Sequence, residues 1–101
     1  MKTINELNED ELLSKIKNLY HTKDTFSFEE ADYISQLIDS YELYTCDIND
    51  IIMEYIYNEL EINGFNYEEH IVWQFTDENI SNSKTGKENY LNLIEYLQEI
   101  N

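Results

Sequence analysis

Hydrophobic residues recur at every third or fourth position along most of the chain, which is the spacing of one face of an α-helix. The segment 48–62 shows this most strongly. Its apolar stripe leaves only a narrow polar arc, so we expect it to lie centrally. Proline is absent and glycine occurs only twice, which favours helices over a turn-rich β structure. The pattern predicts an all-α fold, a small compact bundle of four to five short helices, at about 9–20, 28–43, 48–62, 67 onward and 87–100.

The segment 65–80 has two interpretations. As a helix that begins at Tyr67, it places Ile71 and Phe75 on one face, whereas as a short strand it alternates Ile71, Trp73 and Phe75. We favour the helix because the chain has no clear second strand to pair with this one.

Helix starts are marked by a capping residue that stands three positions before an acid. A side chain that caps the first turn and an acid within that turn both stabilise a helix N-terminus. Asn63-Gly64 is the corresponding signal for a helix end, because glycine readily adopts the left-handed conformation that closes a helix. The five start signals are Asn8 with Glu11, Ser27 with Glu30, Asp47 with Asp50, Asn66 with Glu69 and Thr85 with Glu88.

The length and composition predict a single cytoplasmic domain that covers residues 1–101. A chain of 101 residues has room for one core, and its 42% hydrophobic residues are enough to fold one. No apolar run approaches the roughly 18 residues of a membrane span, and the first residues lack the apolar core of a signal peptide. Cys46 is the only cysteine, which fits a reducing compartment.

Charge is the most unusual property of the chain. The sixty residues from Asp24 to Ser83 contain fifteen carboxylates and no lysine or arginine, and the whole chain carries a net charge of −16. Carboxylates without interleaved cations repel one another and lower the stability of the fold. We therefore predict that the charge is kept for a positively charged partner, although a charged helix face is often simply solvated surface.

The acids that face outward in the predicted helices are the candidate contacts with that partner. Glu29, Asp32 and Asp39, together with Gln36, form one such strip at helical spacing. These carboxylates would stand in for phosphates, and Trp73 and exposed tyrosines would add anchoring contacts. The predicted partner-binding residues are Glu29, Asp32, Asp39, Glu42, Asp47, Asp50, Glu54, Glu61, Glu68, Glu69, Trp73, Asp77 and Glu78.

Catalysis and cofactor binding are disfavoured. The adjacent acids Glu29-Glu30 and Glu68-Glu69 are explained more simply by helix starts than by acid–base catalysis. His70 has no second histidine or cysteine at ligand spacing, and the chain has no glycine-rich phosphate loop. We predict no catalytic residue, no metal and no cofactor. The sign of the charge and the absence of arginine also argue against direct binding of nucleic acid or of an anionic membrane.

A short stretch resembles the Ocr-type antirestriction proteins of phages, which are small, acidic, helical mimics of duplex DNA. The resemblance lies in Ile34, Asp39, Tyr44 and the pair Asp47-Ile48; Glu42-Leu43 replace the Val-Pro of that family, and the chain lacks its polyacidic tail. Acidic phage anti-CRISPR proteins are similar in size and charge. The resemblance implies a phage-type inhibitor that acts in the host cell cytoplasm, as a monomer or homodimer, on the basic nucleic-acid-binding site of a bacterial nuclease, either a restriction enzyme or a CRISPR effector.

The segment from Ile4 to Leu13 is similar to the first helix of immunity proteins that neutralise bacteriocin nucleases. The third-helix segment of that family, with two adjacent tyrosines and a proline, is missing here. The alternative function is therefore that of an immunity protein for a bacteriocin or toxin nuclease.

Overall fold

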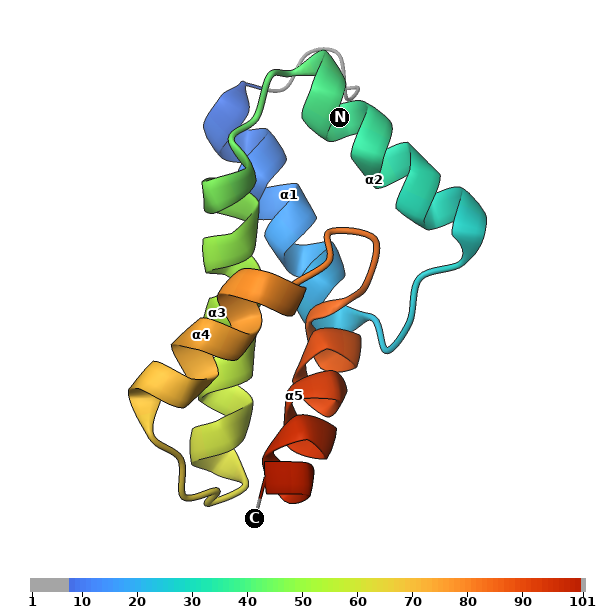
Figure 1. The fold of residues 1–101 in the computed structure, drawn as a ribbon. Helices are drawn as coiled ribbons and strands as arrows, with labels where there is room; N and C mark the ends of the chain where they lie inside the picture. The colour runs from blue at the N-terminus through green and yellow to red at the C-terminus, as the bar shows by residue number, and fades with distance from the viewer. Residues whose placement is uncertain (1–7, 101) are drawn as a thin grey trace.

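The computed structural model describes residues 8–100, which form five α-helices and no strand within that range (Figure 1). The predicted all-α bundle is therefore confirmed. The segment 65–80 contains a helix, which is the interpretation that we favoured. This helix begins at Glu69, two residues after the predicted start at Tyr67. The helices are α1 (Glu9–Thr22), α2 (Phe28–Ser40), α3 (Thr45–Ile62), α4 (Glu69–Asn79) and α5 (Gly86–Ile100).

Helix α3 is the centre of the fold, as its apolar pattern predicts. It packs against both α1 and α5, which follow one another along its length (Figure 1). Helix α1 contacts α3 near Ile51 and Glu54, and the first residue of α5 lies against Tyr55 of α3. This arrangement makes the molecule elongated, with extents of 47 × 23 × 21 Å.

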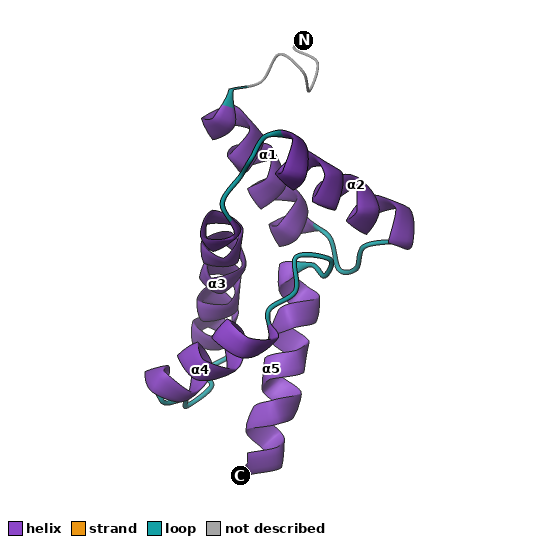
Figure 2. Cartoon of the chain, turned by 45° about the horizontal axis from the view of Figure 1, so that its top comes forward, coloured by secondary structure: helices purple, strands orange, loops and turns teal. Residues whose placement is uncertain are grey.

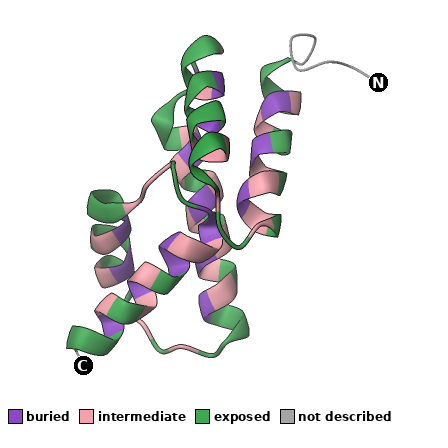
Figure 3. Cartoon of the chain, turned by 90° about the vertical axis from the view of Figure 1, so that its right-hand side faces the viewer, coloured by how far each residue is buried: buried purple, intermediate pink, exposed green. Residues whose placement is uncertain are grey.

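The hydrophobic core follows the α3 stripe. Ile48, Ile52, Ile56 and Leu60 are fully buried because residues four apart lie on one side of a helix. The other helices turn their own apolar stripes toward it, and exposed residues cover their outer sides (Figure 3). The partners of the α3 stripe in the core include Leu12, Ile16, Tyr20, Ile34, Leu37, Val72, Leu93 and Leu97.

Helices α2 and α4 are peripheral. Helix α2 packs less closely on the rest of the bundle than the other helices and lies beside its upper end (Figures 1 and 2). It inserts Ile34 and Leu37 into the core. Helix α4 packs mainly on α5, where the rings of Phe75 and Tyr96 stack with their centroids 4.6 Å apart.

The loop between α4 and α5 is fixed by buried polar side chains. Asn89 exchanges two hydrogen bonds with the backbone of Ser81, both 3.1 Å long. Thr85 donates a hydrogen bond of 2.8 Å to the carbonyl of Asp24, and the Tyr20 hydroxyl donates to the carbonyl of Asn82. The loop therefore joins the start of α5 to the end of α1.

Three of the five predicted helix starts are confirmed. The Asn8 side chain accepts from the backbone N–H of Glu11 at 2.8 Å, and Ser27 with Glu30 forms a reciprocal capping box before α2. Thr85 forms the same pair of bonds with Glu88, each 3.1 Å long.

The other two predicted starts are wrong. Helix α3 begins at Thr45, so that Asp47 lies inside its first turn, and its cap position, Tyr44, makes no side-chain bond to the helix. Helix α4 begins at Glu69, and Asn66 belongs to an extended segment in front of it. In that segment Phe65 and Tyr67 pack against the core, and this packing holds the segment out of the helix.

The predicted end of α3 is confirmed, whereas α2 ends earlier than predicted. Gly64 adopts a φ of 65° just after α3, in the left-handed region. Helix α2 ends at Ser40 rather than Leu43, because Glu42 turns the chain with a φ of 52°. Leu43 then enters the core.

Within residues 8–100, none of the helices combines the length and the apolar character needed to cross a membrane. Residues 4–7, the first part of the segment that resembles immunity proteins, lie outside the described range.

Candidate partner-binding surface

Nearly all of the predicted partner-binding residues lie on the surface. Twelve of the thirteen are exposed, and Asp47 is half-buried in the first turn of α3. The exposed strip on α2 is formed as predicted by Glu29, Asp32 and Asp39, with Gln36 donating a hydrogen bond of 2.9 Å to Asp32. These carboxylates are therefore available to a partner, and they remain in contact with water.

The lysines compensate only a small part of this charge. Within residues 8–100, lysine ion pairs join Lys17 to Glu54 at 2.7 Å, Lys87 to Asp24 at 3.1 Å, and Lys23 to Glu30. The other acids between positions 24 and 83 have no lysine partner among these residues. One ion pair with a histidine is present, between Glu68 and His70 at 3.4 Å, and it depends on protonation of the imidazole.

Glu54 is the predicted contact residue whose charge is partly satisfied within the chain. Lys17 reaches it from α1, which the order of residues along the chain does not reveal. The hydrogen bond from the Lys17 ammonium holds the pKa of Glu54 below its ordinary value, so this carboxylate stays ionised. We expect Glu54 to contribute less to a partner than the acids on α2 and α4.

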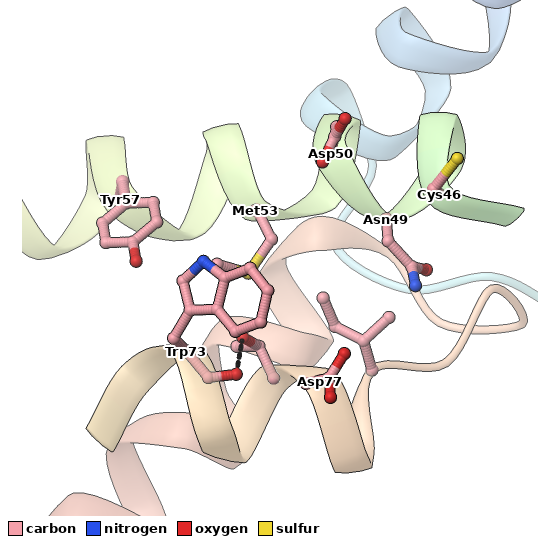
Figure 4. A pocket seen from close by; sticks show the side chains of 9 residues that line it. Cys46, Asn49, Asp50, Met53, Tyr57, Trp73 and Asp77 are labelled. Carbon is pink, nitrogen blue, oxygen red and sulfur yellow. Dashed lines mark hydrogen bonds between the residues drawn. The ribbon is translucent and has the colours of Figure 1, made fainter. Parts of the chain in front are cut away.

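A groove between α3 and α4 brings together three of the predicted residues: Asp50, Trp73 and Asp77 (Figure 4). Its cavity volume is about 300 Å³. The indole of Trp73 lies between the two helices next to Met53, and it is 61% exposed (Figure 4). The groove therefore combines an apolar, aromatic floor with one carboxylate from each helix.

The groove exists because α4 rests on α5 and stands away from α3. Val72 and Thr76 are the buried residues of α4, and the Thr76 hydroxyl is satisfied by the carbonyls of Val72 at 2.8 Å and Trp73 at 3.1 Å. The face of α4 that carries Trp73 and Asp77 is left opposite α3.

On the α3 side of the groove, sequence reasoning identified Asp50 but missed the other lining residues. Residues 46, 49, 50, 53 and 57 recur at helical spacing and form a second stripe on α3, next to the isoleucine stripe. On α4 the residues 73, 76 and 77, together with residue 80 just after the helix, form the matching stripe. The stripe on α3 mixes polar and apolar side chains, so that hydropathy alone does not separate it from solvated surface.

Tyr57 closes one end of the groove. Its ring lies 6.0 Å from that of Tyr67, measured between centroids. Burial raises the pKa of the Tyr57 hydroxyl, and the negative charge of Glu69 adds to this effect. Glu69 thus extends the acidic rim of the groove toward the start of α4.

In residues 8–100, no three side chains of histidine, cysteine, aspartate or glutamate come together as a metal site. Comparison with protein-family models, with curated proteins and with solved structures finds no match for this chain. The functional argument therefore depends on the charge and the geometry of the surface.

Proposed function

We propose that this protein is an acidic inhibitor that occupies the basic nucleic-acid-binding site of another protein, a bacterial defence nuclease. The observation that carries the proposal is the exposed acidic surface between positions 24 and 83, of which the lysines within residues 8–100 compensate only three acids. A surface of this kind lowers the stability of the isolated protein and gains most from a partner with positive charge.

The charge density supports competition with nucleic acid. Duplex DNA of the same 47 Å length would carry about 28 phosphates, at about 1.7 Å of axis per charge. Residues 8–100 contain 21 acids and five lysines, a net charge of −16. The protein thus presents more than half of the charge of such a duplex, and its binding should be sensitive to salt for the same reason.

The proposed mechanism is steric and electrostatic. Acids on α2, on α3 and on α4 attract the basic channel and guide association. The bound protein then excludes the nucleic acid by mass action, with no chemical step. The resemblance to Ocr-type antirestriction proteins implies the same class of target, and the proposed place of action is the cytoplasm of the host cell.

The test is a pull-down from a bacterial lysate with the immobilised protein, at low and at high salt. We expect nucleic-acid enzymes to be retained at low salt and to be released by high salt or by added duplex DNA. An immunity protein would instead retain one cognate toxin nuclease and leave restriction and CRISPR enzymes unbound. Capture of no nucleic-acid enzyme even in dilute buffer would overturn the proposal.

Two charge variants make this test specific. Each removes four exposed acids and therefore has the same net charge of about −12, because four unit charges are lost. The first variant, on α2 and α4, should lose most of its retained partner, and the second, on α1 and α5, should lose little. Equal losses would indicate a response to net charge alone. The first carries Glu29→Gln, Asp32→Asn, Asp77→Asn and Glu78→Gln, and the second Glu9→Gln, Asp10→Asn, Glu95→Gln and Glu99→Gln.

A further inference from the structure

We propose that the α3–α4 groove receives an arginine side chain of the partner protein, whose guanidinium stacks on Trp73 and pairs with Asp77, with Asp50 adding negative charge at the rim. This inference rests on the proposed function and deepens it, because it names the kind of side chain that the groove recognises. It concerns a single contact, so that it can fail while the wider acidic surface still binds a basic protein.

The first argument is the aromatic floor. Trp73 is the only tryptophan in the chain, and it is exposed. It lies in the groove with Met53 and Tyr57 (Figure 4). A purely electrostatic surface needs no such group. Tryptophan is the aromatic residue that attracts cations most strongly, and arginine stacks on it through its planar guanidinium.

The second argument is the placement of charge. Asp50 and Asp77 come from opposite helices and are both exposed along the groove, and neither has a lysine partner within residues 8–100. A guanidinium carries donors on several sides, so it can stack on the indole and pair with Asp77 while Asp50 adds negative charge at the rim, whereas an ammonium acts as a point charge. The groove therefore favours arginine over lysine.

The third argument is size. The cavity of about 300 Å³ is at the small end of ligand pockets, which span roughly 300–1,000 Å³. A volume of this size suits a side chain better than a cofactor. Asn49 also lines the groove, and its Oδ1 is a buried acceptor for which residues 8–100 supply no donor.

Trp73 provides a direct readout, because it is the only tryptophan in the chain. The experiment is a titration of the whole protein with a tetra-arginine peptide capped at both ends, followed by tryptophan emission at low salt. We expect saturable binding and a change in emission. Binding of tetra-lysine in the same titration should be about fivefold weaker or more, because stacking on the indole and bidentate pairing with Asp77 are lost. Equal affinity for the two peptides would overturn the proposal.

Matched charge variants separate the groove from general attraction. The variant Asp50→Asn with Asp77→Asn should weaken tetra-arginine binding about tenfold, whereas Glu95→Gln with Glu99→Gln, on α5, should weaken it by no more than about twofold. Both pairs remove two exposed carboxylates and leave the same net charge. Equal weakening by the two pairs would show that the groove carboxylates have no special role.

Cys46 supplies a second readout that does not need tryptophan. It is the only cysteine, it is exposed, and it lines the groove. Tetra-arginine should slow its alkylation by iodoacetamide in the wild-type protein, and Trp73→Leu should abolish this protection. Circular dichroism of the variant checks that it is folded, as expected for a change at an exposed position. Full protection in folded Trp73→Leu would refute the role assigned to the indole.

Discussion

Replacement of Glu42 by glycine is expected to stabilise the protein. Glu42 has a φ of 52°, the one positive φ outside glycine within residues 8–100. It follows α2 in a turn that the bond from the Leu43 N–H to the Ile38 carbonyl closes at 3.0 Å. Helix α3 ends in the same way: the Phe65 N–H bonds the Leu60 carbonyl at 3.0 Å, but there the left-handed position is held by Gly64. The chain thus contains the same helix-ending turn twice. The turn after α3 has glycine at the left-handed position, whereas the turn after α2 has glutamate there.

The magnitude follows from the backbone conformation. A side chain in the left-handed region costs about 1–2 kcal/mol, from which the extra entropy that glycine loses on folding, about 0.5–1 kcal/mol, must be subtracted. Removing a negative charge next to the negative end of α2 adds a favourable contribution of a few tenths of a kcal/mol. We therefore expect Glu42→Gly to raise the free energy of unfolding by about 1 kcal/mol, which corresponds to about 4–8 °C in Tm.

Urea and thermal unfolding followed by circular dichroism measure this change. Glu42→Gln removes the charge and keeps the strain, so it should recover only the smaller electrostatic part. Gly64→Ala is the reverse control: a methyl group there would meet nothing within 4 Å, and the expected loss of about 1 kcal/mol reports backbone strain alone. The reasoning is refuted if Glu42→Gly is no more stable than Glu42→Gln. If Glu42→Gly is more stable but binds the partner more weakly, the strained glutamate is kept for binding.

Three further predictions concern the core and the charge. Tyr20→Phe removes the hydrogen bond to the Asn82 carbonyl and should cost about 1 kcal/mol in urea unfolding. Burial raises the pKa of Tyr20, so the stability that depends on its neutral form is intact below about pH 10 and is lost as the pH rises above that value, by about 1.4 kcal/mol per pH unit. The difference in unfolding free energy between wild type and Tyr20→Phe should therefore become smaller in alkaline solution. A difference that does not change with pH would contradict this. Gly86→Ala places a methyl group 2.7 Å from a ring carbon of Tyr55 and 3.0 Å from the Tyr20 carbonyl oxygen, so it should lower Tm through a loss of about 1–3 kcal/mol; a wild-type Tm would show that α5 shifts freely. Salt should stabilise the protein, because the screening length falls from about 30 Å at 0.01 M to about 8 Å at 0.15 M, well below the 47 Å length of the molecule. A Tm that is independent of salt would contradict the view that the carboxylates repel one another.

The helices themselves could be predicted from the sequence because local signals determine them. The isoleucine stripe of α3 identifies its buried face, and the boxes at Ser27 and Thr85 set the starts of α2 and α5. The start of α3 could not be found in this way. It follows a turn in which Leu43 is drawn into the core, and the capping position is taken by Tyr44, which has no capping group. Tertiary packing replaces the local signal at this point.

The candidate site was predicted in composition but not in geometry. The exposed acids follow from helical periodicity, and Trp73 was identified as an anchor. That Asp50 and Asp77 share a groove with Trp73 depends on how α4 packs, and the stacking of Phe75 on Tyr96 of α5 is one of the contacts that place it. The sequence also does not show that Lys17 reaches Glu54. Thirty-six residues lie between them in the chain, and they meet because α1 packs on α3.

The lysines and the acidic surface are separated by the architecture of the fold. Within residues 8–100, lysines occur on α1, on α5 and in the loops that join them to their neighbours, and α1 and α5 are the helices that pack along α3 to form the core. Helices α2 and α4 are peripheral, contain no lysine, and carry six of the twelve acids proposed to contact a partner; four more lie on α3, which also has no lysine. A partner can therefore approach α2 and α4 without disturbing the α1–α3–α5 core. It follows that neutralising acids on these two helices should weaken binding while leaving Tm unchanged or raising it, because repulsion within the folded chain is relieved at the same time. If these acids instead stabilised the fold, neutralising them would lower Tm.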